Sequence, residues 1–241
     1  MPAFADMEAG YRNLWARMQV VRTEETLKAA QGILEDRARY ENVEQATGVP
    51  WFFIGPVHHR ESNRSFAGVL HNGERIIGTG RKTRLVPAGR GPFASWDEAA
   101  IDAIRLQKLD QVGDWTLPRI LYEFERYNGF GYIKQRINSP YVWAGTNLQQ
   151  PGKYVRDGVF DRNHMDVQLG CAAMLAKLME LDDSIAVELG ITGEGEDASQ
   201  DQEPGPFTTI KDYDANALIV ELTSRPHVES VQVTYRKPPG H

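Results

Sequence analysis

Cysteine is almost absent from the 241-residue sequence, in which Cys171 is the only example. A single cysteine excludes a disulfide framework within the chain and a cysteine-based zinc site. Its surroundings, LGCAAMLAKL, are typical of a buried helix face, where a free cysteine behaves as a small apolar residue. We therefore expect Cys171 to be an ordinary core residue.

Long apolar runs are also missing. No stretch of about 18 apolar residues occurs, so the sequence predicts no membrane insertion. The segment MPAFADMEAGYRNLWARMQVV lacks the charged region followed by a continuous apolar core that a secretory signal requires. We therefore expect synthesis in a cytoplasm without a signal peptide.

Positive charge is in the minority, because 27 basic residues face 33 acidic ones and the net charge is −6. A protein that wraps nucleic acid has a basic surface, so we expect no nucleic-acid partner. The basic run RKTRLVPAGR, residues 81–90, is the exception. We interpret it as a solvated loop, with contact to an anionic surface as the alternative.

Histidines raise the alternative of a metal site, since the sequence contains His58, His59, His71 and His164. Zinc hydrolases commonly place two histidines one helical turn apart. His58 and His59 are adjacent, and on a helix they point about 100° apart, so they do not easily face one ion. We expect no metal and no other cofactor, and His58 is more simply a core or supporting residue near Glu61.

Helical patterning dominates what is present. Residues 5–46 predict one or two amphipathic helices ending at Gly48, and residues 50–62 predict a buried helix that starts with a proline in its first turn. Ser95 and Glu98 form a capping box that opens another helix. Further helices are expected before the break at Asn128-Gly129 and over residues 161–181, separated by an aromatic-rich loop.

One β-hairpin is expected among these helices. Residues 65–80 contain Asn72-Gly73 between two short apolar runs, which is the strongest local hairpin signal. The sequence therefore predicts an α+β fold that is mainly α, with a small β-hairpin following the buried helix.

Composition divides the chain into three parts. Residues 1–188 form the predicted main domain, 189–206 an acidic flexible linker rich in Gly and Pro, and 207–241 a short β-rich tail. The tail strands ALIVELT and VESVQVTY are too short to form a core alone. We expect them to pair as a hairpin that docks on the main domain or on a second copy, allowing self-association.

The segment WFFIGPVHHRES, residues 51–62, places a lone glutamate at the end of a strongly apolar run. A carboxyl group held against apolar walls has a raised pKa and can stay protonated near neutral pH as a general acid. Cleavage of a glycosidic bond needs such an acid beside the leaving oxygen. The alternative for Glu61 is an exposed residue in unfavourable contact with the helix dipole.

Several segments together resemble one family. A buried helix ending in Glu-Ser, a hairpin and a helix ending in YNGFGY occur in this order in the lysozyme-like superfamily, which includes goose-type lysozymes and lytic transglycosylases. The segments VPWFFIGPVHHRES, LHNGE, VPAGRGP, YNGFGYIKQRINSPYVWAGTN and YVRDGVFD resemble its phage and prophage endolysins. Two residues depart from the family pattern, Glu74 where an aspartate is usual after HNG, and Pro56 within the catalytic helix.

The resemblance implies a lysozyme-like helical domain with the hairpin at the active site. It also implies a muramidase that cleaves peptidoglycan glycan strands at the β-1,4 bond between N-acetylmuramic acid and N-acetylglucosamine. Glu61 lies at the position of the catalytic acid. As in similar endolysins, the protein would act on the cell wall after release through a pore formed by another protein.

A second carboxylate would activate water or stabilise the transition state. Glu74 is the best candidate because it follows the hairpin turn, and Thr79 and Thr83 could hold the water. For Glu74 the alternative is a surface charge beside a turn. A separation of roughly 6.5–9.5 Å between the two carboxyl groups would indicate inversion, and about 5–5.5 Å would indicate retention.

Aromatic residues gather in a loop-rich segment that starts at Tyr127, beside the break at Asn128. Sugar rings have flat apolar faces that stack on such side chains, and Asn128 could bind an N-acetyl group. The alternative is that the aromatic residues belong to the core. The expected substrate-binding residues are Tyr127, Asn128, Tyr132, Tyr141 and Trp143.

Two other functions fit the same resemblance. A lytic transglycosylase would use the muramic acid hydroxyl in place of water and leave 1,6-anhydro ends, and a convincing second carboxylate would argue against it. A virion or wall-binding protein could keep the fold without activity, and an intact Glu61 argues against that.

Overall fold

The computed structural model describes residues 2–156 and 158–191. The chain divides into two compact units, Met1–Gly193 and Glu194–His241, and the second lies outside the described residues. The predicted linker beyond residue 191, the tail hairpin and the self-association therefore remain predictions.

The described residues are mainly helical, with one two-stranded antiparallel sheet, as the sequence predicted for the fold class. The elements are, in chain order, α1 (Phe4–Ala16), α2 (Thr23–Glu35), α3 (Arg37–Thr47), α4 (Trp51–Ser62), α5 (Trp96–Leu106), η1 (Leu109–Gln111), α6 (Leu117–Asn128), α7 (Gly131–Gln135), α8 (Pro140–Trp143), β1 (Lys153–Arg156), β2 (Val159–Asp161), α9 (Cys171–Leu181) and α10 (Ser184–Glu188).

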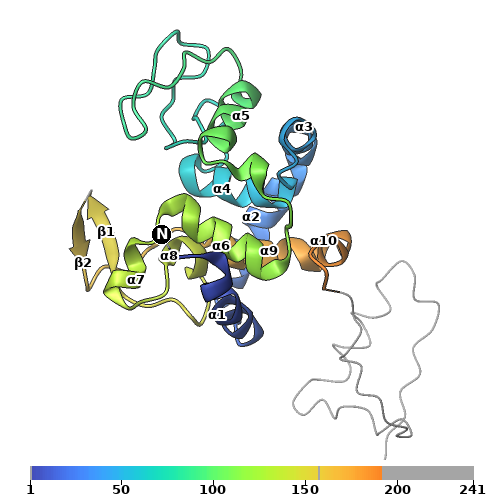
Figure 1. The fold of residues 1–241 in the computed structure, drawn as a ribbon, viewed down its shortest axis with the longest axis vertical. Coiled ribbons are helices and arrows are strands. Elements are labelled where there is room, and N and C mark those ends of the chain that lie inside the picture. The colour runs from blue at the N-terminus through green and yellow to red at the C-terminus, as the bar shows by residue number, and fades with distance from the viewer. Residues whose placement is uncertain (1, 157, 192–241) are drawn as a thin grey trace, which may run out of the picture. The chain divides into compact units, whose positions relative to one another are not determined.

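Helix α4 is the centre of the described unit and packs against α2, α3, α6 and α9 (Figure 1). It begins at Trp51, with Pro50 as the N-cap instead of in the first turn as the sequence predicted, and it continues through Pro56. A helix that is apolar on all sides is a buried helix. Its buried residues are Trp51, Phe52, Phe53, Ile54, Gly55, Pro56, Val57, His58 and Arg60.

Several helix ends were predicted correctly from local signals. Gly48 ends α3 in the left-handed conformation with φ of 73°. At the start of α5, the Ser95 hydroxyl accepts the Glu98 backbone N–H at 3.2 Å, and the Glu98 carboxylate accepts the backbone N–H of Ala94. Helix α6 ends at Asn128. Cys171 is fully buried, as expected.

The predicted hairpin over residues 65–80 is wrong. This segment contains a single isolated bridge, between Gly68 and Arg75, in place of two strands. The side chains of Asn72 and Glu74 form hydrogen bonds with the backbone of residues 84–86. The residues after the turn therefore belong to a long loop instead of a second strand. The antiparallel pair β1–β2 instead lies in the segment that we expected to be an aromatic-rich loop.

Two further expectations about helices need correction. Residues 5–46 contribute three helices, not one or two, because the chain breaks before Thr23 and again at Asp36. The closing helix starts at Cys171 instead of residue 161. Gly170 precedes it in an extended conformation, and a Cβ there would collide with the carbonyl of Val142.

Candidate active site

A polar cleft of about 460 Å³ opens beside the C-terminal end of α4. Its walls come from the last turn of α4, the junction of α6 and α7, helix α8 and the hairpin β1–β2. The described lining residues are Arg60, Glu61, Asn128, Gly129, Gly131, Tyr132, Tyr141, Lys153, Tyr154, Val155, Arg156, Gly158 and Gln168.

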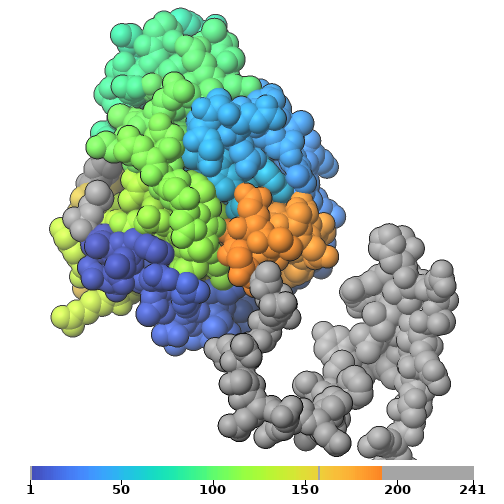
Figure 2. Space-filling view, turned by 45° about the vertical axis from the view of Figure 1, so that its right-hand side comes forward, coloured from blue at the N-terminus to red at the C-terminus, as the bar shows by residue number. Residues whose placement is uncertain are grey.

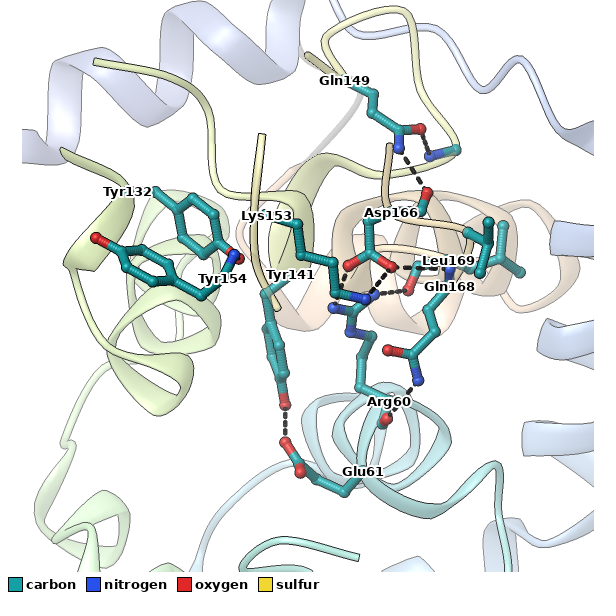
Figure 3. A network of polar contacts seen from close by, with 12 residues as sticks. Arg60, Glu61, Tyr132, Tyr141, Gln149, Lys153, Tyr154, Asp166, Gln168 and Leu169 are labelled. Atoms are coloured by element: carbon teal, nitrogen blue, oxygen red, sulfur yellow. Dashed lines mark hydrogen bonds and ion pairs between the residues drawn. The ribbon is translucent and has the colours of Figure 1, made fainter. Parts of the chain in front are cut away.

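Glu61 lies in the last turn of α4 and reaches this cleft. The Tyr141 hydroxyl donates a hydrogen bond of 2.8 Å to its Oε1 (Figure 3). Burial raises the pKa of Glu61 to about 7, although the Tyr141 hydrogen bond and the charge of Arg60 act in the opposite direction. A carboxyl group with this pKa is substantially protonated at neutral pH and can donate a proton to a ligand.

Two tyrosines from different helices form the immediate surroundings of this carboxyl group. Burial and the nearby charge of Glu61 raise the pKa values of Tyr127 and Tyr141 well above the usual value. The Tyr127 hydroxyl donates to the carbonyl of Leu70 at 2.6 Å, and its ring packs on Phe53. Tyrosines of α6 and α8 therefore form part of the wall around the Glu61 carboxyl group.

The structure brings four of the expected residues to one cleft, namely Glu61, Asn128, Tyr132 and Tyr141. Tyr132 packs edge to face against Tyr154 of β1, with ring centroids 5.2 Å apart. Its hydroxyl accepts the Tyr154 backbone N–H at 3.3 Å. The hairpin that forms one wall is therefore attached to α7 by aromatic packing.

Trp143 does not share this site. Its side chain is 1% exposed in the core, and it borders a separate cavity next to α1. A side chain this deeply buried has no face available to a sugar ring, so the expectation that Trp143 stacks on substrate is wrong. The Trp143 indole completes the packing of α8 against the core, which was the alternative interpretation.

Glu74, Thr79 and Thr83 are absent from the described lining of the cleft. The Glu74 carboxylate accepts the backbone N–H groups of Arg84 at 2.8 Å and Leu85 at 2.9 Å. The Thr79 hydroxyl donates to the carbonyl of Ile76 at 2.7 Å. These contacts stabilise the loop that follows the turn.

Thr83 makes the same kind of contact. Its buried hydroxyl donates to the carbonyl of Pro87 at 2.6 Å and accepts the backbone N–H of Arg90 at 2.9 Å. Both hydrogen-bonding directions of the hydroxyl are thus used within the loop, and the geometry gives no support to a water-holding role. Glu61 is the only residue with a carboxylate among the described residues that line the cleft. Asp157 is not among the described residues.

A buried charge network that the sequence did not indicate lies directly behind the cleft (Figure 3). Asp166 is 2% exposed, and its carboxylate accepts hydrogen bonds from Arg60 at 2.9 Å and Lys153 at 2.8 Å. Burial alone would raise the pKa of Asp166, but the Arg60 charge and these hydrogen bonds hold it below the usual value. The network joins α4, β1 and the segment before α9.

Arg60 connects this network to the candidate acid. Its guanidinium carbon lies 4.8 Å from the ring centroid of Tyr141, and its Nη1 donates to the carbonyl of Leu169. The Gln168 side chain in turn donates to the Arg60 carbonyl at 3.1 Å. The helix end that carries Glu61 is therefore fixed from both sides, by the ring of Tyr141 and by the segment before α9.

Two of the histidines, His58 and His71, make structural contacts. His58 is buried against Tyr40, whose hydroxyl lies 3.0 Å from its Nδ1, and burial lowers the His58 pKa to about 4. His71 pairs with Asp102. In the part of the chain that the structure describes, no group of three or more His, Cys, Asp and Glu side chains is placed to hold a metal ion. None of the described helices is both long and apolar enough to cross a membrane.

No family model, curated protein or solved structure matches this chain. The functional interpretation therefore depends on the geometry of the cleft and on the resemblance of the quoted sequence segments.

Proposed function

We propose that this protein cleaves peptidoglycan glycan strands at the β-1,4 bond between N-acetylmuramic acid and N-acetylglucosamine, with a lysozyme-like fold and Glu61 as the general acid. The observation that supports this most directly is Glu61 itself, a carboxyl group with a pKa raised to about 7 at the side of an open cleft. Perturbed carboxyl groups in clefts are frequent at catalytic sites.

The surrounding groups suit the two halves of such a reaction. Protonated Glu61 gives its proton to the oxygen of the leaving sugar, and the bond to the anomeric carbon breaks as the oxocarbenium-like state forms. Glu61 is then a carboxylate, which the Tyr141 hydroxyl stabilises through the existing hydrogen bond. The carboxylate can next accept the proton of the attacking hydroxyl group or water.

A specific observation favours the lytic transglycosylase reaction as the second candidate. Among the described residues that line the cleft, which do not include position 157, only Glu61 has a carboxylate. The Glu74 carboxylate accepts hydrogen bonds from the backbone N–H groups of the loop. Intramolecular attack by the muramic acid hydroxyl needs one group that acts as acid and then as base. Hydrolysis usually employs a second carboxylate.

Mass spectrometry of the products separates the two reactions, since only transglycosylation leaves 1,6-anhydro ends. Glu74→Gln gives a second criterion. If Glu74 only stabilises the loop, this variant keeps its rate within about tenfold, whereas loss of a catalytic carboxylate lowers the rate by about 10²–10⁴-fold.

The proposal itself is tested by turbidity clearing of permeabilised Gram-negative cells. Wild type and Glu8→Gln, a surface control in a helix pair, should clear the suspension, and Glu61→Gln should not. A folded wild type that binds cell walls without releasing fragments would identify the third candidate, a wall-binding protein without activity.

A further inference from the structure

The loop after the Asn72-Gly73 turn is basic, whereas the chain as a whole is acidic. No acidic residue occurs from residue 75 to residue 96, although the whole chain has a net charge of −6. We call residues 75–90 the basic loop. Its exposed cations are Arg75, Arg81, Lys82 and Arg84. None of these four pairs with a carboxylate in the described part of the chain, so they concentrate positive potential in one place.

The basic loop has a fixed backbone. The Glu74 carboxylate accepts the N–H groups of Arg84 and Leu85, and the Asn72 amide donates to the carbonyls of Leu85 and Val86 at 3.3 Å each. Arg90 at its far end pairs with Asp102 of α5. Cations on an ordered backbone lose less entropy when they bind a ligand than cations on a mobile one.

The base of the loop touches the helix end that carries the candidate acid. Gly73 has φ of +75°, and a Cβ at this position would collide with the carbonyl oxygen of Glu61. Gly68, which bridges to Arg75, packs in the same way against Ser62. The turn that anchors the basic loop therefore lies directly on the last turn of α4.

The loop itself extends from the helical body next to α5 (Figure 1), and in the space-filling view it forms a protrusion at one end of the described unit (Figure 2). A long polymer bound beside Glu61 continues past the ends of the cleft. The basic loop, whose anchoring turn lies on the last turn of α4, is then a cationic surface that such a polymer can reach.

We propose that the basic loop is an accessory binding surface for the carboxylate groups of the wall polymer, beyond the sugar units held in the cleft. The choice of polymer rests on the proposed function. A peptidoglycan strand carries peptide stems with free carboxylates on alternate sugars, whereas a chitin oligosaccharide is neutral. The loop thus favours intact, peptide-bearing wall over neutral glycans.

The experiment uses the full chain with Glu61→Gln, so that binding is measured without cleavage. Cosedimentation with purified Gram-negative sacculi is compared with and without the added changes Arg81→Gln, Lys82→Gln and Arg84→Gln. We expect the triple variant to bind at least about tenfold more weakly at low salt and to lose most of its salt dependence. Affinity for chitohexaose, a neutral ligand, should not change.

Controls address folding and total charge. The Glu74 contacts are to backbone N–H groups, so glutamine at 82 and 84 leaves them in place. Arg81 also donates to the Arg75 carbonyl, and the double variant Lys82→Gln with Arg84→Gln avoids this loss. A matched variant removes three exposed cations elsewhere, Arg12, Arg17 and Lys28, and should bind sacculi as the parent does.

Two outcomes would overturn the proposal. One is equal binding of sacculi by the loop variant and the parent. The other is a loop-dependent affinity for vesicles of phosphatidylglycerol and phosphatidylcholine without any loop-dependent affinity for sacculi. The second outcome would assign the surface to lipid, through the exposed Leu85 and Val86, which are 58% and 77% exposed. Cleavage by the Glu61→Gln parent would contradict the proposed function but not the binding result.

Discussion

The Tyr141 hydroxyl of α8 and the Glu61 carboxyl group of α4, two residues 80 positions apart in the chain, form a hydrogen bond of 2.8 Å. It is the one side-chain hydrogen bond that the structure gives to Glu61 among the described residues. Because this bond is stronger when Glu61 is ionised, it lowers the pKa of Glu61 against the larger effect of burial. Tyr141 thus moderates the pKa of the candidate acid, which burial raises, without supplying the proton.

Tyr141→Phe removes this bond and keeps the ring. The Glu61 carboxylate loses a stabilising donor, so the alkaline limb of the activity profile should move to higher pH, by up to about one pH unit. The midpoint is read from kcat/KM measured between pH 5 and 9. Tyr132→Phe is the matched control, since the Tyr132 hydroxyl has no bond to Glu61, and an equal shift in both variants would contradict the role of Tyr141.

The wild-type pH profile should show an alkaline limb with a midpoint near 7, because a general acid is active only while protonated and the Glu61 pKa is about 7. Activity that stays constant from pH 6 to 9 would mean that another group donates the proton.

Glu61→Gln should change stability in a pH-dependent way. The folded pKa of about 7 lies above the ordinary glutamate value of 4.5, so the folded wild type holds a proton that the unfolded chain has lost between these values. Wild-type stability therefore falls as pH rises from about 4.5 to about 7. Relative to wild type, Glu61→Gln should gain up to about 3 kcal/mol over this range.

Urea unfolding at pH 4.5 and pH 7.5 measures this difference. The glutamine variant cannot lose a proton, so its stability should be nearly constant where that of the wild type declines. If the two proteins keep the same difference in stability at both values, Glu61 is not desolvated as described.

Local signals in the sequence were sufficient to predict α4 and the position of Glu61. Pro50 marks the start of the helix, and the apolar run after it requires burial on every side. The capping box at Ser95 and the glycine at position 48 fix helix ends through contacts within a few residues. Such signals need no knowledge of the rest of the chain.

Contacts between distant segments explain what the sequence did not predict. Asn72-Gly73 predicts a hairpin, but Asn72 and Glu74 bind backbone groups more than nine positions away and open the turn into a loop. Arg60 and Asp166 are separated by 106 positions, and no local sequence pattern links them. Their pairing follows only from the packing of α9 against α4.

Asp166→Asn should destabilise the protein by about 3–5 kcal/mol, because it leaves the buried Arg60 guanidinium without its counter-ion. The change is measured from urea or thermal unfolding. Glu8→Gln breaks an exposed pair with Arg12 and should cost less than about 1 kcal/mol. Equal, small effects of the two substitutions would show that Arg60 is accessible to water.

Trp143→Ala tests the correction to the predicted binding site. The indole is almost fully buried in the core, so its removal leaves a cavity between α8 and its neighbours and should cost about 3–5 kcal/mol of stability. At a temperature where the variant remains folded, its affinity for chitohexaose should equal that of wild type. Tyr132→Ala is the comparison, since Tyr132 lines the cleft with Glu61 and its loss should weaken chitohexaose binding. Weaker binding by Trp143→Ala together with an unchanged melting temperature would restore Trp143 to the substrate site, because a stacking residue contributes to affinity and little to the core.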